Sequence, residues 1–139
     1  MTLDDWVRNG WLRAHTPSEQ EIRNRFAIVD RDRADAATTS ISLDAQLGML
    51  YNAALRLADI ALRHCGYRAG HERQHYRVIT SLSFTLGNDW KETTRFLERV
   101  QKLRHRKDYE SVGLATRTQV DELGKIVEKL QTAVRDLVR

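Results

Sequence analysis

Apolar residues recur along this chain at spacings of three and four, which is the pattern of helices that bury one face. The first stripe consists of Ile22, Phe26 and Val29. Thr16-Pro17-Ser18-Glu19 precedes it and combines an N-cap threonine, proline at the first helical position and glutamate at the third. We therefore expect a helix to begin at Thr16, with the charged stretch from Asp30 to Asp35 on its exposed face.

A second helix is predicted from Ser42 to Cys65, and its apolar residues form two stripes. One stripe is Leu43, Leu47, Leu50, Ala54 and Leu57, and the other is Tyr51, Leu55, Ala58, Leu62 and Cys65. A helix that is apolar on two sides packs against neighbours on both, so this one should lie at the centre of the fold.

Three further helices follow the central one. One is expected from about His71 to Leu86, where Gly87 ends it, and the next from Trp90 towards Tyr109, capped by Asn88 or Asp89. Thr116 or Thr118 should cap the last. Its apolar seam alternates spacings of three and four, as in helical bundles: Val120, Leu123, Val127, Leu130, Val134 and Leu137.

These elements predict an all-α fold, an up-and-down four-helix bundle with short extra helices. No segment has the pattern of a strand. A short amphipathic turn from Thr2 to Arg8, packed down by Trp6 and Trp11, should form part of an N-terminal extension of residues 1–15. Residues 16–139 would form the bundle, and 139 residues fit a single domain.

Composition places the protein in the cytoplasm. The lone cysteine, Cys65, forms no intrachain disulfide and gives no sign of an oxidising compartment. The first ten residues contain two acids and no apolar run, so we expect neither a signal peptide nor a membrane anchor. No segment approaches the roughly 20 apolar residues of a membrane span.

One candidate for chemistry is His71-Glu72-Arg73-Gln74-His75, an HExxH sequence. On a helix the two histidines share a face and can bind zinc, with Glu72 as general base. The extended zinc motif fails, because Ile79 and Leu82 occupy its glycine and third-histidine positions. We therefore expect no metal and no other cofactor. A zinc peptidase using His71, Glu72 and His75 remains an alternative.

A second candidate is the helix that begins near Trp90. From Lys91 to Lys107 it carries seven basic and two acidic residues, within a chain of net charge +4. Trp90, Phe96, Leu97, Val100 and Leu103 fall within one arc of the helix, and basic residues face the other way. This basic stripe is either a solvated face or a track for a phosphate backbone. Its members are Arg95, Arg99, Lys102, Arg106 and Lys107.

Arg104 departs from this pattern. It follows Val100 by four residues and Leu97 by seven, so its side chain leaves from the apolar side of the helix. An arginine in that position must be paired or must line a cleft, because an unpaired buried guanidinium is unstable by several kcal/mol. Asp108, one turn further on, is the local partner; the alternative is a cleft.

Arg104-His105-Arg106-Lys107-Asp108-Tyr109 resembles a degenerate form of the signature of the HEPN family, an arginine followed four to six residues later by histidine. Arg104 matches the arginine, His105 the polar position after it, and Tyr109 stands where the histidine would be. Tyr51 to Ala58 and His75-Tyr76-Arg77 extend the resemblance, towards an actinobacterial subgroup whose motif ends in tyrosine. It covers most of the chain from Thr16 onward.

This resemblance implies a helical bundle that forms a homodimer, with the motifs of two subunits in one cleft. Active members of the family are metal-independent ribonucleases of bacterial toxin–antitoxin and defence systems, whereas others bind nucleotides or a nucleotidyltransferase. In the ribonucleases the arginine stabilises phosphate charge and the histidine moves protons. A phenol such as Tyr109 is a poor general base at neutral pH, although it can still donate a hydrogen bond to phosphate.

The leading hypothesis is a HEPN-type homodimer that binds RNA or a nucleotide through Arg104, His105 and Tyr109, with or without cleavage. The alternative from a different class is a non-catalytic partner of a nucleotidyltransferase antitoxin.

Overall fold

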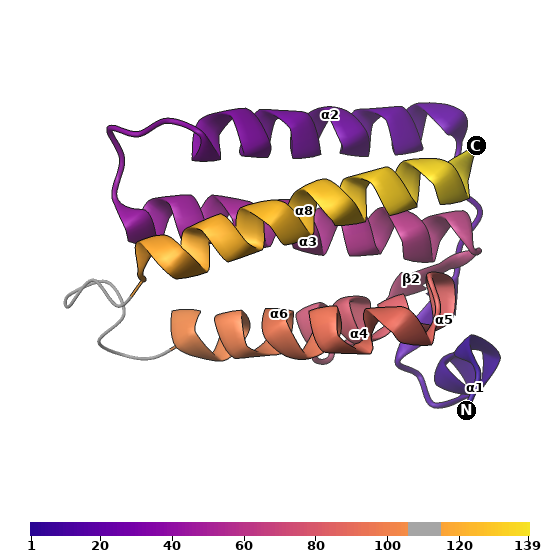
Figure 1. Ribbon diagram of the computed structural model, residues 1–139. Helices are drawn as coiled ribbons and strands as arrows, with labels where there is room; N and C mark the ends of the chain where they lie inside the picture. The colour runs from indigo at the N-terminus through magenta and orange to yellow at the C-terminus, as the bar shows by residue number, and fades with distance from the viewer. Residues whose placement is uncertain (106–114) are drawn as a thin grey trace.

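The computed structural model describes residues 1–105 and 115–139, and it is mostly helical (Figure 1). Four long helices run alternately in opposite directions: α2 (Glu19–Ala36), α3 (Leu43–His64), α6 (Lys91–Arg104) and α8 (Arg117–Val138). The short helical elements are α1 (Leu3–Arg8), α4 (Gln74–Thr80), α5 (Leu82–Thr85) and a 3-10 turn, η1 (Asn88–Trp90). The all-α prediction is confirmed. In the described part of the chain no helix has the length and apolar character needed to cross a membrane.

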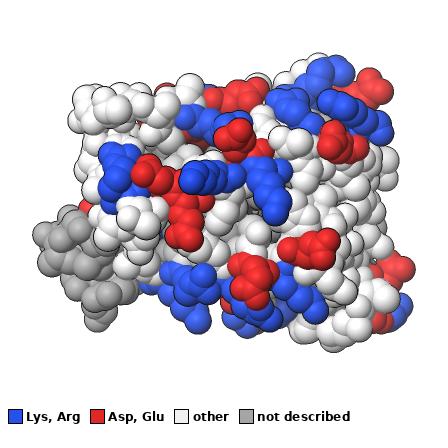
Figure 2. Space-filling view, in the orientation of Figure 1, with Lys and Arg blue, Asp and Glu red and all other residues white. Residues whose placement is uncertain are grey.

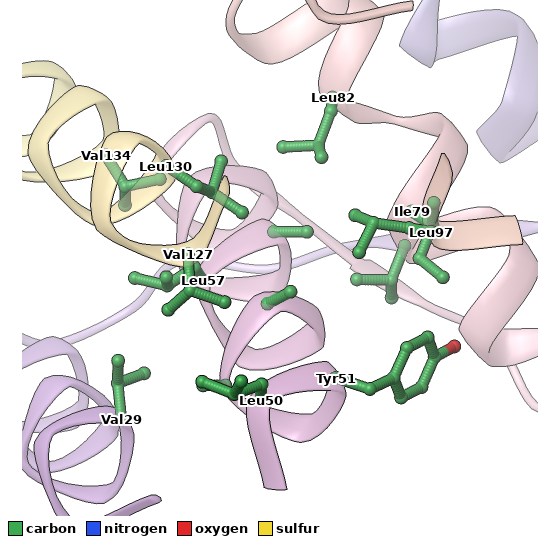
Figure 3. Packing of buried hydrophobic residues seen from close by; sticks show 14 of the residues in the cluster. Val29, Leu50, Tyr51, Leu57, Ile79, Leu82, Leu97, Val127, Leu130 and Val134 are labelled. Carbon is green, nitrogen blue, oxygen red and sulfur yellow. The ribbon is translucent and has the colours of Figure 1, made fainter. Parts of the chain in front are cut away.

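The central position of α3 is also confirmed. It packs against α2, α8 and α4, and side chains on several of its sides are fully buried, among them Leu47, Leu57 and Ile60. Leu50 and Tyr51 leave the helix in different directions, with Tyr51 on the same side as Ile79 and Leu97 (Figure 3). The core therefore surrounds α3, with one part towards α2 and α8 and the other towards α4 and α6.

Three of the four long helices begin at a side-chain cap, whereas α6 follows Trp90 without one, so the cap predicted at Asn88 or Asp89 is wrong. The Ser42 hydroxyl caps α3 at Ala45, and Thr116 forms a capping box with Gln119 at the start of α8, as predicted. The predicted start of α2 at Thr16 is wrong by two residues. Ser18 is the N-cap, and its hydroxyl accepts a hydrogen bond from the Glu21 amide, so Pro17 lies before the helix.

Two other predictions about elements are wrong. A short antiparallel pair of strands, β1 (Leu12–Ala14) and β2 (Tyr67–Ala69), joins the N-terminal segment to the end of α3. The helix expected from His71 begins at Gln74, because Arg73 has a left-handed backbone (φ 51°), and it is divided at Ser81 into α4 and α5.

The charged stretch at the end of α2 is not uniformly exposed. Asp32 is buried, and its carboxylate accepts hydrogen bonds from Arg56 of α3 and from Arg31. Nearby, Asp59 of α3 accepts hydrogen bonds from Arg25 and Arg63, each at 2.9 Å. These ion pairs connect α2 to α3, in addition to the apolar contacts between the two helices.

Candidate functional site

Arg104, the last residue of α6, lies half-buried and points towards α3. Its guanidinium Nη1 donates a hydrogen bond to Asn52 Oδ1 at 3.4 Å, and its central carbon lies 4.9 Å from the centre of the Tyr51 ring. Within residues 1–105 and 115–139 no carboxylate forms an ion pair with it. The inward direction predicted for Arg104 is confirmed, while its predicted partner Asp108 lies outside the described residues.

Tyr51 connects Arg104 to a third element, because His75 of α4 also borders its ring. The two ring centres are 6.5 Å apart and tilted by 50°. Residues from α3, α4 and α6 therefore meet at one place. The HExxH spacing suggested that His75 shares a zinc site with His71. In the structure the neighbours of His75 are instead Tyr51 and Arg104.

Three adjoining hollows form a groove around this meeting point. The first lies between α4 and α6, with a volume of about 630 Å³, and is lined by Arg73, Gln74, His75, Tyr76, Glu98, Gln101, Lys102 and His105. The second, between α3 and α4, shares Gln74 and His75 with it. The third, between the start of α3 and Arg104, shares Asn52 with the second. We call the three together the Arg104 groove.

The electrostatics of the groove favour an anion. The first hollow has two permanent cations, Arg73 and Lys102, and a single carboxylate, Glu98. Although His75 is exposed as a residue, partial desolvation lowers the pKa of its imidazole, and the nearby charges of Arg104 and His105 act in the same direction. The His75 imidazole is therefore neutral at pH 7 and free to accept a proton or a hydrogen bond.

The Tyr51 hydroxyl is an anomaly in the core beside the groove. Tyr51 is 1% exposed, and its hydroxyl has no hydrogen-bond partner within the described part of the chain. Burial raises the pKa of Tyr51 to about 12, even though the positive charge of Arg104 opposes the shift. A buried hydroxyl without a partner destabilises a fold, and such groups are retained most often where a ligand or a water completes the bond.

We expect Tyr51→Phe to stabilise the protein by about 1 kcal/mol at neutral pH, because it removes an unpartnered buried polar atom. The effect should grow in alkali. The folded state keeps the Tyr51 proton up to about pH 12, whereas the unfolded chain loses it near pH 10, so wild-type stability falls by about 1 kcal/mol per pH unit above pH 10. Urea unfolding at pH 7 and pH 11 measures both effects.

Tyr67→Phe is the control for this experiment, because the Tyr67 hydroxyl donates a hydrogen bond to Asp4. Losing that bond should leave the protein slightly less stable at pH 7, which is the opposite sign. A Tyr51→Phe protein that unfolds more easily than wild type at pH 7 would contradict the assignment of its hydroxyl as unpartnered.

The basic stripe of α6 contributes little to the groove. Arg95, Arg99 and Lys102 are exposed as predicted, but only Lys102 lines a hollow. Arg95 pairs with Glu92, and Arg99 lies 5.6 Å from the Phe96 ring. On the face shown in Figure 2 basic and acidic side chains are interspersed, including along the lower edge where α6 runs. Arg106 and Lys107 lie outside the described residues.

The two residues predicted to act together with Arg104 are His105 and Tyr109. His105 is exposed, caps the end of α6 and lines the first hollow, whereas Arg104 lines the third. Tyr109 lies outside the described residues. Among the described residues, Asn52 accepts a hydrogen bond from Arg104 and the Tyr51 ring lies beside its guanidinium, and sequence analysis assigned neither to the site. Both residues belong to the segment Tyr51 to Ala58, which the sequence analysis noted for its resemblance to the family without assigning a function to either residue.

The HExxH sequence lacks the helix on which its zinc chemistry depends. His71 and Glu72 lie in the turn before α4, and the left-handed Arg73 separates them from the helix that carries His75. The two histidines are therefore not one turn apart on a helix face. Across the described ranges no three side chains of the types His, Cys, Asp and Glu are grouped as a metal site requires.

Comparison with known proteins adds no relative. No protein-family model matches the chain, and neither the curated proteins nor the solved structures contain a match. The candidate site is therefore defined by this chain's own residues: Arg104, Tyr51, Asn52 and His75 at the meeting point of α3, α4 and α6.

Proposed function

We infer that this chain binds RNA or a nucleotide in the Arg104 groove, as expected of a HEPN-type protein. The observation that carries the proposal is the state of Arg104: half-buried, held by Asn52 and Tyr51, and without a carboxylate partner among the described residues. A planar guanidinium placed in this way is suited to a phosphate, whose oxygens accept two of its hydrogen bonds at once.

The groove also contains the groups that metal-independent RNA cleavage requires. In such cleavage the 2′-oxygen bonds to the phosphorus while the bond to the 5′-oxygen breaks. A base takes the proton of the 2′-hydroxyl, the departing 5′-oxygen takes a proton from water, and a cation stabilises the charge on the phosphate. Arg104 would supply the cation and His75 the base, because the lowered pKa of His75 leaves its imidazole neutral at pH 7. His75 thus takes the place that the family motif gives to a histidine and that Tyr109 holds in this sequence. Dimerisation, which the family resemblance also implies, stays a prediction.

A salt titration of RNA binding tests the proposal. A labelled single-stranded RNA hexamer should bind wild-type protein with an affinity that falls about 20-fold between 50 and 200 mM salt, as expected when about three phosphates of a single strand are neutralised. Lys102→Ala should reduce the slope by roughly one unit. Fluorescence anisotropy measures both, and gel analysis of the same RNA in EDTA separates binding from cleavage.

Arg68→Ala is the matched control, since Arg68 is an exposed arginine of β2 that lines none of the three hollows. It should leave the salt slope as it is. Absence of RNA binding at 50 mM salt, or a slope equally sensitive to Arg68 and Lys102, would refute an RNA-binding groove.

A further inference from the structure

The first hollow of the Arg104 groove contains a stacked pair of side chains that phosphate binding does not explain. The guanidinium carbon of Arg73 lies over the Tyr76 ring, 4.1 Å from its centre, and both side chains line the α4 side of the hollow. Flat rings stack favourably on aromatic and guanidinium faces. At about 630 Å³ the hollow has the size of a small-molecule site.

Arg73 reaches this position through an unfavourable backbone. It is the non-glycine residue with a positive φ in the described part of the chain (φ 51°, ψ 42°), and its side chain forms no capping hydrogen bond with α4. Residues with a Cβ rarely adopt this conformation, and strained residues of this kind cluster at turns and at functional sites. The strained turn places the guanidinium over Tyr76.

Side chains that can form hydrogen bonds lie around the stacked pair, two on the facing helix and one on α4 itself. Glu98 and Gln101 of α6 line the same hollow, and Gln74 borders it from α4. None of these three side chains makes a hydrogen bond or ion pair within residues 1–105 and 115–139. Two amides and a carboxylate offer both donors and acceptors, which is the mixture that the edge of a nucleobase requires.

We propose that this hollow is a nucleobase subsite, in which a base stacks on the Arg73 guanidinium, which itself rests on the Tyr76 ring, and the edge of the base hydrogen-bonds to Gln101 and Glu98. The inference rests on the proposed function, because it assigns the base of the same RNA or nucleotide whose phosphate Arg104 binds. His75 lines both the first and the second hollow, so a ligand that extends from Tyr76 towards Arg104 passes beside its ring.

Comparing RNA with its abasic analogue separates the subsite from the phosphate site. We expect wild-type protein to bind a labelled adenosine hexamer about ten-fold more tightly than an abasic hexamer with the same phosphates, the effect of one well-stacked base. Tyr76→Ala should remove this ratio and leave the affinity for the abasic strand unchanged. Tyr76→Phe, which keeps the ring, should retain the ratio.

Arg73→Gly tests whether a loss of base preference could result from misfolding of the variant. Glycine adopts the left-handed conformation readily, so this variant should melt at or above the wild-type temperature while losing most of the preference for the base-bearing strand. Arg135→Ala is its control, because Arg135 also lies over an aromatic ring, that of Phe26 at 4.4 Å, but between α8 and α2. It should keep the full ratio.

The outcomes distinguish the two proposals. Equal binding of both strands by wild type overturns the nucleobase subsite and leaves phosphate binding standing. Binding of neither strand overturns both. If Arg73→Gly and Tyr76→Ala both fold and each still prefers the adenosine hexamer to the abasic hexamer as strongly as wild type does, the proposal also fails, because the base must then bind elsewhere.

Discussion

Replacing Arg104 with alanine should lower RNA affinity at least about 100-fold while changing the free energy of unfolding by no more than about 1 kcal/mol. Affinity should fall because the substitution removes a bidentate, charged hydrogen-bond donor to phosphate. Such charge-assisted hydrogen bonds are stronger than neutral ones. Stability should change little because the hydrogen bond that Arg104 makes within residues 1–105 and 115–139, to Asn52, is long at 3.4 Å and the side chain is only half-buried. Anisotropy and thermal unfolding of the same preparation measure the two quantities.

Two variants provide controls for that measurement. Arg104→Lys keeps the charge but not the planar fork, so it should recover only part of the lost affinity. Arg95→Ala removes an exposed arginine of the same helix that pairs with Glu92, and its affinity should fall by less than about three-fold. If Arg104→Ala instead unfolds the bundle while each folded molecule binds RNA normally, Arg104 is a structural residue and the groove has another purpose.

Gly48 offers an independent check on the same pocket. This glycine lies inside α3, and a methyl group added to it would lie 3.7 Å from the Arg104 guanidinium, in ordinary van der Waals contact. Alanine is the better helix former by up to about 1 kcal/mol. The helix-interior glycine therefore leaves space beside the cation at the expense of helix stability, which is consistent with a site that a ligand occupies.

The helices that sequence analysis predicted well are those whose signals are local. Ser42 and Thr116 each begin a helix with a side-chain cap, and the residues that follow repeat at helical spacing. The inward direction of Arg104 was equally local, since it follows from its position relative to Leu97 and Val100. In each case the information lies within two or three turns of one helix.

The features that it missed depend on contacts between distant segments. β1 and β2 are three residues each, too short for an alternating pattern, and they pair across more than fifty residues of sequence. Asp32 was expected in solvent but is buried by an ion pair with Arg56 of the next helix. Neither could be recognised from the residues on either side.

The site shows the same division. HExxH suggested that His75 belongs with His71, because a regular helix would place them one turn apart. The left-handed Arg73 interrupts that helix, and the neighbours of His75 become Tyr51, 24 positions earlier, and the Arg104 side of α6. A motif that assumes one regular helix fails at a strained residue, and strained residues are frequent at binding sites.

The stability of the bundle should depend most on the centre of α3, and Leu57→Ala tests this directly. Leu57 is fully buried in the cluster that also contains Val127 and Leu130 of α8 (Figure 3). Removing three carbons there loses transfer free energy and leaves a cavity that a well-packed core cannot close. We expect about 3 kcal/mol of destabilisation and a melting temperature lower by about 10 °C.

Leu55→Ala is the matched control, because it makes the same chemical change on the same helix at a half-buried position. Its effect should be about 1 kcal/mol, since less apolar surface returns to water and no enclosed cavity forms. Chemical unfolding of both variants with an unchanged denaturant slope gives the comparison. Equal effects at the two positions would mean that α3 is not enclosed on the side of α8. The Arg104 groove would then lack its rigid support, because Tyr51 and Asn52 are held in place by this helix.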